Sequence, residues 1–356
     1  MSSDPVEAMR QAIRLASRTH PHPNPRVGAV VVDPEGRVLS EGAHTGPGRA
    51  HAERVALEPL AGRSLPAGAT LVVTLEPCDH HGRTPPCTDL IIESGIRHVV
   101  VGARDPDPRV TGEGIRRLKE SGIDVQEGLL AQEIEEADPA YFHHRRHGRA
   151  HFLLKRAMTL DGQTAAADGS SRWITGPEAQ GDSHRLRREV DAVLVGAGTL
   201  RADDPLLTIR LPGYEGPQPR AVVLAGDGPL PPGARLWDRP GTLVVAAHPV
   251  DVPVETITVD QDAHGLPDLA QMAVELGERG LLGILVEGGA RISSTLWRGG
   301  LVDRGVTYIG GFIAGGTGVP VIAGTWDTVA DGRSVEILEV ARIGNDVRID
   351  WRPTRE

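Results

Sequence analysis

Short apolar runs alternate with an amphipathic segment along the first half of the chain. From Pro5 to Ser17 the apolar residues recur at the spacing of one helical face, which predicts a helix. Three short apolar runs predict buried strands: Gly28–Val32, Thr70–Leu75 and His98–Gly102. A second helix is expected over Thr88–Ser94. Such alternation of strands and helices predicts an α/β layer.

The second half of the chain repeats this alternation. Helices are expected over Pro177–Val190 and Pro267–Leu276, and each begins near a proline, a residue favoured in the first helical turn. Five apolar runs predict strands: His151–Leu154, Ala192–Val195, Ala221–Ala225, Thr242–Ala246 and Gly283–Val286. The second half is therefore expected to be α/β as well.

A change of composition between Asp138 and Arg149 marks the expected boundary between two domains. This stretch is basic, contains His143, His144 and His147, and lacks an apolar period. A solvated linker is favoured over a second metal site, because none of the histidines has ligand spacing with a carboxylate or a thiol. The first domain is placed at residues 1–146 and the second at residues 147–356.

Length, composition and charge narrow the class of protein. The chain has 356 residues, of which 39% are hydrophobic and 24% charged, as in a globular protein of about two domains. Its net charge of −10 disfavours broad binding to nucleic acid or to anionic membranes. No apolar run is long enough for a membrane helix, and the first ten residues have no secretory pattern. We expect a cytoplasmic protein that binds neither membrane nor nucleic acid.

The two cysteines of the chain, Cys78 and Cys87, follow a histidine that can share a metal ion with them. His51 precedes Cys78 by 27 residues, and one imidazole with two thiolates suits Zn²⁺ while leaving a fourth position open for water. Glu53, two residues after His51, could take a proton from that water and deliver it to a leaving amine. A disulfide is the alternative, which cytosolic proteins seldom keep.

This arrangement contains the His-x-Glu and Pro-Cys pattern of zinc nucleobase deaminases. The spacing differs from the plain signature, because eight residues rather than two separate the cysteines. A helix after Cys87 would direct its positive end at that thiolate and favour ionisation.

The segment from Pro77 to Cys87 closely resembles the deaminase half of the bifunctional riboflavin-biosynthesis deaminase/reductase family. Pro23–Gly28 matches the same family. The second half resembles its reductase in four segments: Lys155–Gly162, Ser171–Thr175, Asp203–Arg210 and Glu287–Ala290. The resemblance covers nearly the whole chain. It implies an N-terminal zinc cytidine-deaminase-like three-layer domain and a C-terminal dihydrofolate-reductase-like domain.

For the first domain, the resemblance implies hydrolytic deamination of 2,5-diamino-6-(5-phosphoribosylamino)pyrimidin-4(3H)-one. The family's substrate contacts fall on Asn24, His44, His80 and Arg83. Two positions depart from the family pattern. Asp79 stands where serine is usual and Asp107 where asparagine is usual, and an extra carboxylate would repel a phosphorylated substrate unless it is neutralised.

For the second domain, the resemblance implies that NADPH reduces the ribosyl group to the ribityl side chain. It places cofactor contacts at Ala157, Trp173, Thr199, Asp203, Gly289, Ala290, Arg291, Ile292, Ser293, Ser294 and Thr295. It places substrate contacts at Ser171, Arg187, Leu207, Arg210 and Glu287. Glycines before a helix would let phosphate oxygens approach backbone N–H groups. The family also implies a homo-oligomer, a dimer or a tetramer.

Lys155 is one of only two lysines in a chain that otherwise uses arginine. It occupies the matching family position, which suggests that a compact ammonium is needed beside the opening sugar, where a guanidinium would be too wide. Glu53 and Lys155 are therefore the expected catalytic residues.

Three alternatives remain open. One half of the enzyme could be inactive, which ammonia release would detect. A base deaminase acting on RNA is disfavoured by the acidic net charge and by the long insert between the cysteines. An NADP-sensing or scaffold protein with a structural zinc would leave Glu53 without a role.

Overall fold

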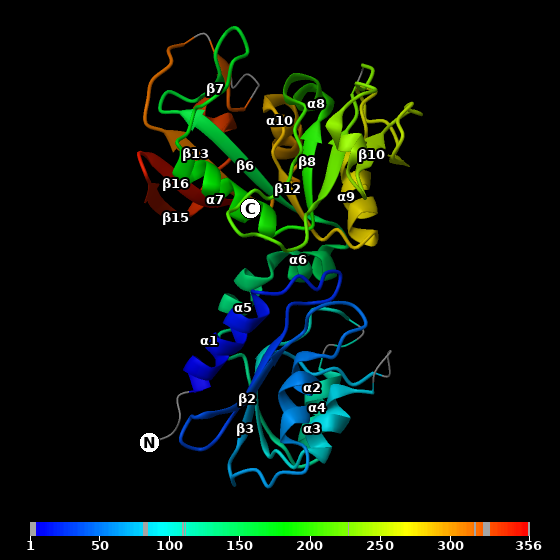
Figure 1. The fold of residues 1–356 in the computed structure, drawn as a ribbon, viewed down its shortest axis with the longest axis vertical. Helices are drawn as coiled ribbons and strands as arrows, with labels where there is room; N and C mark the ends of the chain where they lie inside the picture. Colours follow the sequence, from blue (N-terminus) through cyan, green and yellow to red (C-terminus); the bar gives the residue numbers. More distant parts are fainter. Residues whose placement is uncertain are drawn as a thin grey trace. The chain divides into compact units, whose positions relative to one another are not determined.

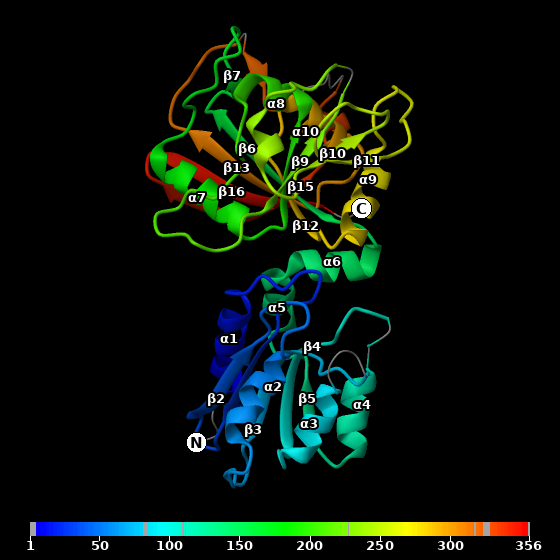
Figure 2. The same cartoon turned by 45° about the vertical axis from the view of Figure 1, so that its right-hand side comes forward.

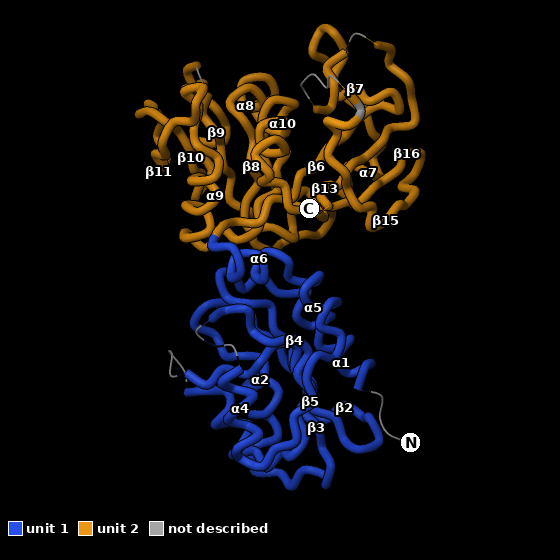
Figure 3. Tube along the Cα trace, turned by 180° about the vertical axis from the view of Figure 1, so that it is seen from behind, with its two compact units in different colours: residues 1–148 blue, residues 149–356 orange. Residues whose placement is uncertain are grey.

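The computed structural model describes residues 5–80, 85–108, 110, 112–226, 228–316, 318–322 and 328–354. The chain divides into two compact units, residues 1–148 and residues 149–356 (Figure 3). Among the described residues, no helix combines the length and the apolar character needed to cross a bilayer.

The first unit is a five-stranded sheet between two layers of helices (Figures 1 and 2). Its helices are α1 (Pro5–Ala16), α2 (Ala52–Leu57), the 3-10 helix η1 (Glu58–Leu60), α3 (Cys87–Glu93), α4 (Glu113–Glu120), α5 (Ala131–Ala137) and α6 (Pro139–His147). Its strands are β1 (Gly28–Val32), β2 (Val38–Ala43), β3 (Thr70–Leu75), β4 (His98–Ala103) and β5 (Asp124–Glu127).

The strand order in this sheet is β2-β1-β3-β4-β5. β1 runs antiparallel to both of its neighbours, whereas β3, β4 and β5 are parallel. Helix α1 packs on β1 so closely that a Cβ on Gly28 would lie 2.0 Å from the Ala12 carbonyl oxygen. Helices α1 and α5 contact each other on one side of the sheet, and α2, α3 and α4 form a contiguous layer on the other (Figure 2).

The second unit is built on a nine-stranded sheet. Its helices are α7 (Pro177–Arg188), α8 (Ala197–Asp203), α9 (Leu269–Glu278) and α10 (Ala290–Arg298), with 3-10 turns η2 (Arg235–Asp238) and η3 (Val329–Asp331). Its strands are β6 (His151–Thr159), β7 (Gln163–Ala165), β8 (Ala192–Gly196), β9 (Arg220–Leu224), β10 (Leu243–Ala246), β11 (Glu255–Thr258), β12 (Gly283–Val286), β13 (Arg304–Gly310), β14 (Val319–Pro320), β15 (Val335–Ile343) and β16 (Asp346–Pro353).

The order of the large sheet is β11-β10-β9-β8-β12-β6-β13-β16-β15, and β7 pairs separately with β14. In this spatial order, every pair of neighbouring strands from β11 to β13 is parallel. The pairs β13-β16 and β16-β15, which complete the sheet, are antiparallel. Two apolar clusters cover its two faces. One contains Met272 of α9 and Leu296 of α10, and the other contains Leu186 of α7 and Leu200 of α8.

The structure confirms the expected α/β architecture of both halves and corrects two local predictions. The basic stretch after Asp138 is not a linker, because α6 buries Ala140, Tyr141 and Phe142. The helix expected from Pro267 begins at Leu269 instead. Asp268 is its N-cap and accepts hydrogen bonds from the backbone N–H groups of Ala270 and Gln271.

Candidate active sites in the two units

The three predicted metal ligands of the first unit come from two helix starts and one strand end. His51 is the N-cap of α2, and Cys87 is the first residue of α3. Cys78 lies beyond the carboxyl end of β3. In parallel sheets, ligands bind at the carboxyl ends of the strands. The ligand atoms of the three residues all lie within 4.8 Å of one another, and this is the one such cluster found among the described residues.

The spacing of these atoms fits Zn²⁺. The Sγ atoms of Cys78 and Cys87 lie 3.5 and 3.3 Å from His51 Nδ1. A tetrahedral zinc with its usual bond lengths separates such ligands by roughly 3.5–3.8 Å. Both cysteines are free thiols, so the disulfide alternative does not hold. Hydrogen bonds from Cys87 and then from His51 lower the pKa of the Cys78 thiol to about 4, which favours its ligating form.

Glu53 lies in the first turn of α2, two residues after His51, and is not a member of the ligand cluster. It is 3% exposed, and burial, followed by the charge of Cys78, raises its pKa to about 7. A carboxyl group with this pKa can both accept and donate a proton near neutral pH.

Two of the predicted metal ligands, His51 and Cys78, line a cavity of about 640 Å³, and Glu53 lines it as well. Asn24, His44 and His80, three of the expected substrate contacts, also line this cavity. Asn24 Nδ2 donates to His44 Nε2 at 3.0 Å, and His44 Nδ1 donates to the Ala50 carbonyl at 3.0 Å. This pattern requires a neutral imidazole, and burial lowers the pKa of His44 in the same direction. Arg83 lies outside the described residues.

Both unexpected carboxylates lie beside arginines. Asp79 does not line the cavity. Its Oδ1 is 2.6 Å from Arg117 Nη1 and accepts a hydrogen bond from Thr88 at 2.6 Å. Asp107 does line the cavity, and its Oδ2 lies 3.6 Å from Arg145 Nε. Neither carboxylate therefore presents an isolated negative charge to a phosphorylated substrate.

Several residues that were not expected from the sequence also line this cavity, and three of them are connected with one another. Tyr141 and Arg145 come from α6, the stretch interpreted as a linker, and Asp105 follows β4. The Tyr141 hydroxyl donates to Asp105 at 3.0 Å, and the Arg145 guanidinium lies 5.0 Å from the Tyr141 ring centroid. No spacing or motif in the sequence connects this helix with the metal ligands.

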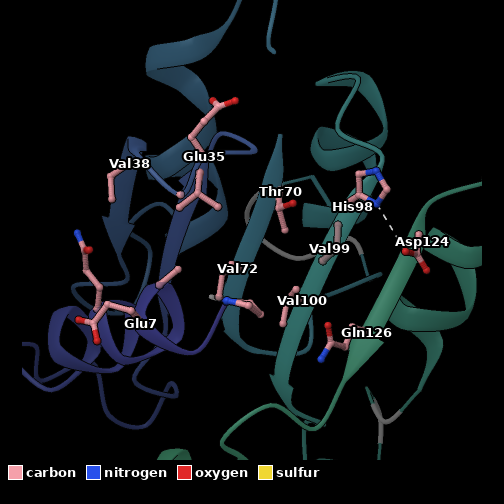
Figure 4. Close-up of a pocket in the computed structure, with 15 residues that line it drawn as sticks. Glu7, Glu35, Val38, Thr70, Val72, His98, Val99, Val100, Asp124 and Gln126 are labelled. Carbon is pink, nitrogen blue, oxygen red and sulfur yellow. Dashed lines mark ion pairs between the residues drawn. The ribbon is translucent and has the colours of Figure 1, made fainter. Parts of the chain in front are cut away.

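A second pocket, of about 390 Å³, lies at the opposite end of the same sheet (Figure 4). Thr70, His98 and Asp124, the first residues of β3, β4 and β5, line it, and His98 pairs with Asp124 at 3.5 Å. No predicted site residue lines this pocket. Ligands of parallel sheets bind at the carboxyl ends of strands, and this pocket lies at the amino ends.

In the second unit, three of the predicted site residues, Lys155, Arg187 and Glu287, lie close together beside β6 and β12. Lys155 lies on β6, and Glu287 directly follows β12, the neighbouring parallel strand. Arg187 of α7 donates two hydrogen bonds of 2.7 Å to the Glu287 carboxylate and a third, also of 2.7 Å, to the Thr208 carbonyl. The ion pair with Arg187, and then the Lys155 charge, lower the pKa of Glu287 against the effect of burial. Burial lowers the pKa of Lys155.

The predicted cofactor segment forms the start of α10. Gly289 is its N-cap, and a Cβ on Gly288 would lie 2.1 Å from Ile292 Cγ2 and 3.6 Å from the Gly196 nitrogen. The turns after β12 and β8 therefore lie side by side, and backbone N–H groups at the start of α10 suit a phosphate. Three residues of this helix, Ser293, Ser294 and Thr295, donate their hydroxyls to carbonyls four residues earlier. Ser293 and Ser294 are fully buried.

The remaining predicted residues of the second unit lie on α8, on β6 and in the loops before α7 and after α8. Thr199 and Asp203 belong to α8, and Asp203 pairs with Arg172 at 3.2 Å. The Trp173 side chain is exposed, Ser171 precedes it, and Ala157 lies on β6. Two further residues lie in the loop after α8, where Leu207 is buried and the Arg210 N–H donates to His184 Nδ1 at 3.3 Å.

Comparison with known protein families gives two matches that together span most of the chain. Residues 150–349 match the RibD C-terminal domain. Residues 2–103 match the zinc-binding region of cytidine and deoxycytidylate deaminases. The riboflavin biosynthesis protein RibD of Bacillus amyloliquefaciens is 38% identical over 97% of this chain and 95% of its own.

Two solved structures are similar over the full length. One is a diaminohydroxyphosphoribosylaminopyrimidine deaminase/5-amino-6-(5-phosphoribosylamino)uracil reductase from Thermotoga maritima, with a TM-score of 0.89 and 37% identity over 98% of this chain and 99% of that chain. The other is RibD from Acinetobacter baumannii, with a TM-score of 0.89 and 31% identity over 99% of both chains.

Proposed function

The chain belongs to the RibD family of bifunctional deaminase/reductases of riboflavin biosynthesis, and from this premise we propose which of its residues perform each reaction. The protein is a zinc-dependent deaminase and an NADPH-dependent reductase. We assign the deaminase to residues 1–146 and the reductase to residues 147–356. The proposed first substrate is 2,5-diamino-6-(5-phosphoribosylamino)pyrimidin-4(3H)-one.

In the deaminase, His51, Cys78 and Cys87 would hold the zinc, and the bound ion would supply the Lewis acidity that activates water for attack on the ring carbon bearing the amino group. Glu53 accepts the proton that this water gives up. It then returns that proton to the departing amine, a transfer that a carboxyl group of pKa about 7 can make in both directions.

The walls of the deaminase cavity bind the pyrimidine. Asn24 and the neutral His44 form a hydrogen-bonded pair that offers polar atoms to the ring edge. Arg83, together with His80, is proposed for the phosphate end, because a guanidinium binds phosphate with two parallel hydrogen bonds. The ion pairs of Asp79 and Asp107 support this assignment, since they limit repulsion of that phosphate.

In the reductase, the chemistry that bound NADPH would supply is a hydride for C1′ of the opened ribosylamino group. We propose that the start of α10, with Thr199, Trp173, Asp203 and Ala157, binds the cofactor. Ser293 and Ser294, being fully buried, contribute through the backbone and the packing of α10 rather than through their hydroxyls.

Lys155 is the proposed catalytic residue of the reductase. It forms no hydrogen bond or ion pair with the described residues, so its ammonium is available to the sugar oxygen. Glu287 is fixed by Arg187 near this ammonium, and Ser171, Leu207 and Arg210 are proposed to complete the substrate site.

We further propose a homo-oligomer in the cytoplasm. Strand β15 is the edge of the large sheet, and Val335, Ile337 and Val340 lie opposite Pro353, Trp351 and Ile349 of β16. The three therefore share one face of the sheet, where they remain exposed. An exposed apolar edge strand favours pairing with a second copy. Two free thiols at a metal site favour a reducing compartment.

The observation that carries this proposal is the His51, Cys78 and Cys87 cluster with Glu53 buried beside it. A pair of variants tests the assignment of residues. Cys87→Ser should abolish ammonia release but still reduce the deaminated intermediate, and Lys155→Arg should show the reverse. A mixture of the two variants should then convert the diamino substrate to the ribityl product. Full reductase turnover by Lys155→Arg would refute the proposed need for a compact ammonium.

A further inference from the structure

Tyr308 lies under the proposed catalytic lysine. Strand β13 pairs in parallel with β6, with Val306 opposite Lys155 and Tyr308 opposite Ala157. Side chains on alternate residues share a face, so Tyr308 and Lys155 project from the same side of the sheet. The Lys155 Nζ lies 5.8 Å from the centroid of the Tyr308 ring, within the range of a cation–π interaction.

The Tyr308 ring is held in place by a hydrogen-bond network at its hydroxyl. Its hydroxyl donates to Asp182 Oδ2 of α7 at 2.7 Å, and Arg348 of β16 donates to the same oxygen at 2.8 Å. Arg185 approaches the other oxygen of Asp182 at 3.3 Å. Tyr308 is 1% exposed, so packing and hydrogen bonds together fix the ring.

Among the described residues, none of the charged groups around Lys155 forms an ion pair with its ammonium. Glu287, directly after β12, favours the charged form of Lys155, whereas Arg187 on α7 and Arg156 on β6 oppose it. Burial lowers the pKa of Lys155 as the largest single effect. Within the described part of the chain, the Tyr308 ring is the group whose face lies next to the Lys155 ammonium. The face of an aromatic ring attracts a cation.

We propose that Tyr308, fixed by Asp182, is a positioning residue of the reductase that holds the Lys155 ammonium charged and directed at the sugar. This inference rests on the proposed catalytic role of Lys155. Tyr308 itself touches neither substrate nor cofactor in this proposal, and it acts through the lysine.

The amino-acid composition provides a direct probe. Because Lys119 and Lys155 are the two lysines of the chain, protein labelled with ¹³C-lysine gives two side-chain NMR signals. Lys119 on α4 pairs with Glu127 in the first unit and serves as the internal reference. A Lys155→Arg sample identifies the Lys155 signal, whose pH titration is followed without substrate.

Three variants are compared with the wild type. Tyr308→Leu removes the ring, whereas Tyr308→Phe keeps the ring and removes the hydroxyl. Phe152→Leu is the matched control. Phe152 is a fully buried aromatic residue of β6 whose side chain belongs to the apolar cluster on the opposite face of the sheet. Ammonia release by the first unit reports on the integrity of each preparation.

Tyr308→Leu should lower the titration midpoint of Lys155 by roughly 0.5–1.5 pH units, the equivalent of one cation–π interaction. The alkaline limb of its reductase pH profile should move by the same amount, so that kcat measured at a fixed pH on that limb falls by about three- to thirtyfold. Its ammonia release should remain at the wild-type rate. Tyr308→Phe should stay within about threefold of the wild type, and Phe152→Leu should leave the Lys155 titration unchanged.

Two results would overturn the inference. One is an unchanged Lys155 titration in Tyr308→Leu with a reductase loss no larger than that of Phe152→Leu. The other is an equal loss in Tyr308→Phe and Tyr308→Leu, which would transfer the effect from the ring to the hydroxyl. Lys155→Met separates this inference from the proposed function, because a fully active Lys155→Met would refute the role of the lysine itself.

Discussion

Four carboxylates line the deaminase cavity, and their hydrogen-bond partners distinguish their roles. Glu76 accepts the Gly112 backbone N–H at 3.0 Å and so ties the start of α4 to the end of β3. Asp105 holds the Tyr141 hydroxyl, and Asp107 lies beside Arg145. Glu53 instead has the metal ligands as its charged neighbours. Its position, more than its residue type, selects it for proton transfer.

Substitution of Glu53 tests this distinction. Glu53→Gln keeps the size and polarity of the side chain but cannot accept the proton, so deamination should slow by about 10²–10⁴-fold. One zinc per chain should remain, as measured by atomic emission, because Glu53 is not a ligand. Reduction of the deaminated intermediate should be unchanged. Loss of zinc from Glu53→Gln would show instead that the residue maintains the metal site.

Sequence alone predicted the cluster of His51, Cys78 and Cys87 that the structure brings together, because histidine, two cysteines and a nearby glutamate have few structural uses in such a pattern. It did not identify Tyr141, Arg145 or Tyr308. Each of these belongs to a residue type that is common in cores and on surfaces, and each reaches its site only through the packing of a distant element. Their roles depend on contacts more than 30 residues away along the chain.

At the scale of elements, α6 shows how local pattern can mislead. Its sequence is dominated by histidine and arginine, yet its first turn is buried. The charged residues are accommodated individually, for example by the bidentate pair of Arg146 with Glu135 at 2.7 Å. Asp138 precedes the helix and is almost fully buried. It accepts from the Arg26 N–H at 2.8 Å and contacts His22 Nε2 at 2.8 Å.

The buried contacts of Asp138 with His22 and Arg26 make the stability of the first unit depend on pH. The His22 charge and hydrogen bond, with Arg26, lower the pKa of Asp138 despite the opposing effect of burial. A carboxyl whose folded pKa is depressed stabilises the fold fully above its unfolded pKa of about 3.9, and this contribution is lost as pH falls through the lower folded value.

Asp138→Asn should therefore reduce the unfolding free energy by about 2–4 kcal/mol at pH 7, since it breaks a buried charged pair. The difference from the wild type should shrink as pH falls below about 4. Denaturant unfolding at several pH values measures both quantities. A difference that stays constant down to pH 2 would contradict the account of Asp138.

Strand β15 leads to a prediction about assembly. Ile337 and Val340 are 59% and 60% exposed on the edge of the large sheet. Ile337→Lys with Val340→Lys should disrupt pairing at this edge and yield monomers in light scattering. Ammonia release should persist, because the metal ligands lie in the other unit. An unchanged oligomer would place the interface elsewhere.

At the scale of the whole molecule, apolar periodicity predicted two α/β halves because buried parallel strands have continuous apolar runs. It missed β2 and β5 of the first sheet and β11, β13, β15 and β16 of the large sheet. β15 exposes most of its residues, and β16 mixes charged and apolar ones, so neither has a buried run. The layered architecture was thus predictable from local sequence, while the edge of the large sheet and the support of Lys155 were not.

Metal removal should separate the two reactions. Because the zinc ligands all belong to the first unit, a chelator should stop ammonia release from the diamino substrate. NADPH oxidation with the deaminated intermediate should continue at its original rate. Restored zinc should restore ammonia release. Loss of both activities on chelation would show that zinc supports the whole chain rather than one reaction.

The most direct test of the central claim, that one chain performs both reactions in order, is to count two products together. Zinc-loaded protein is supplied with the diamino substrate and NADPH, and ammonia release and NADPH oxidation are followed in parallel. We predict that one NADPH is consumed for each ammonia released, after a brief lag while the intermediate accumulates. NADPH consumption without ammonia, or ammonia without NADPH consumption, would contradict it.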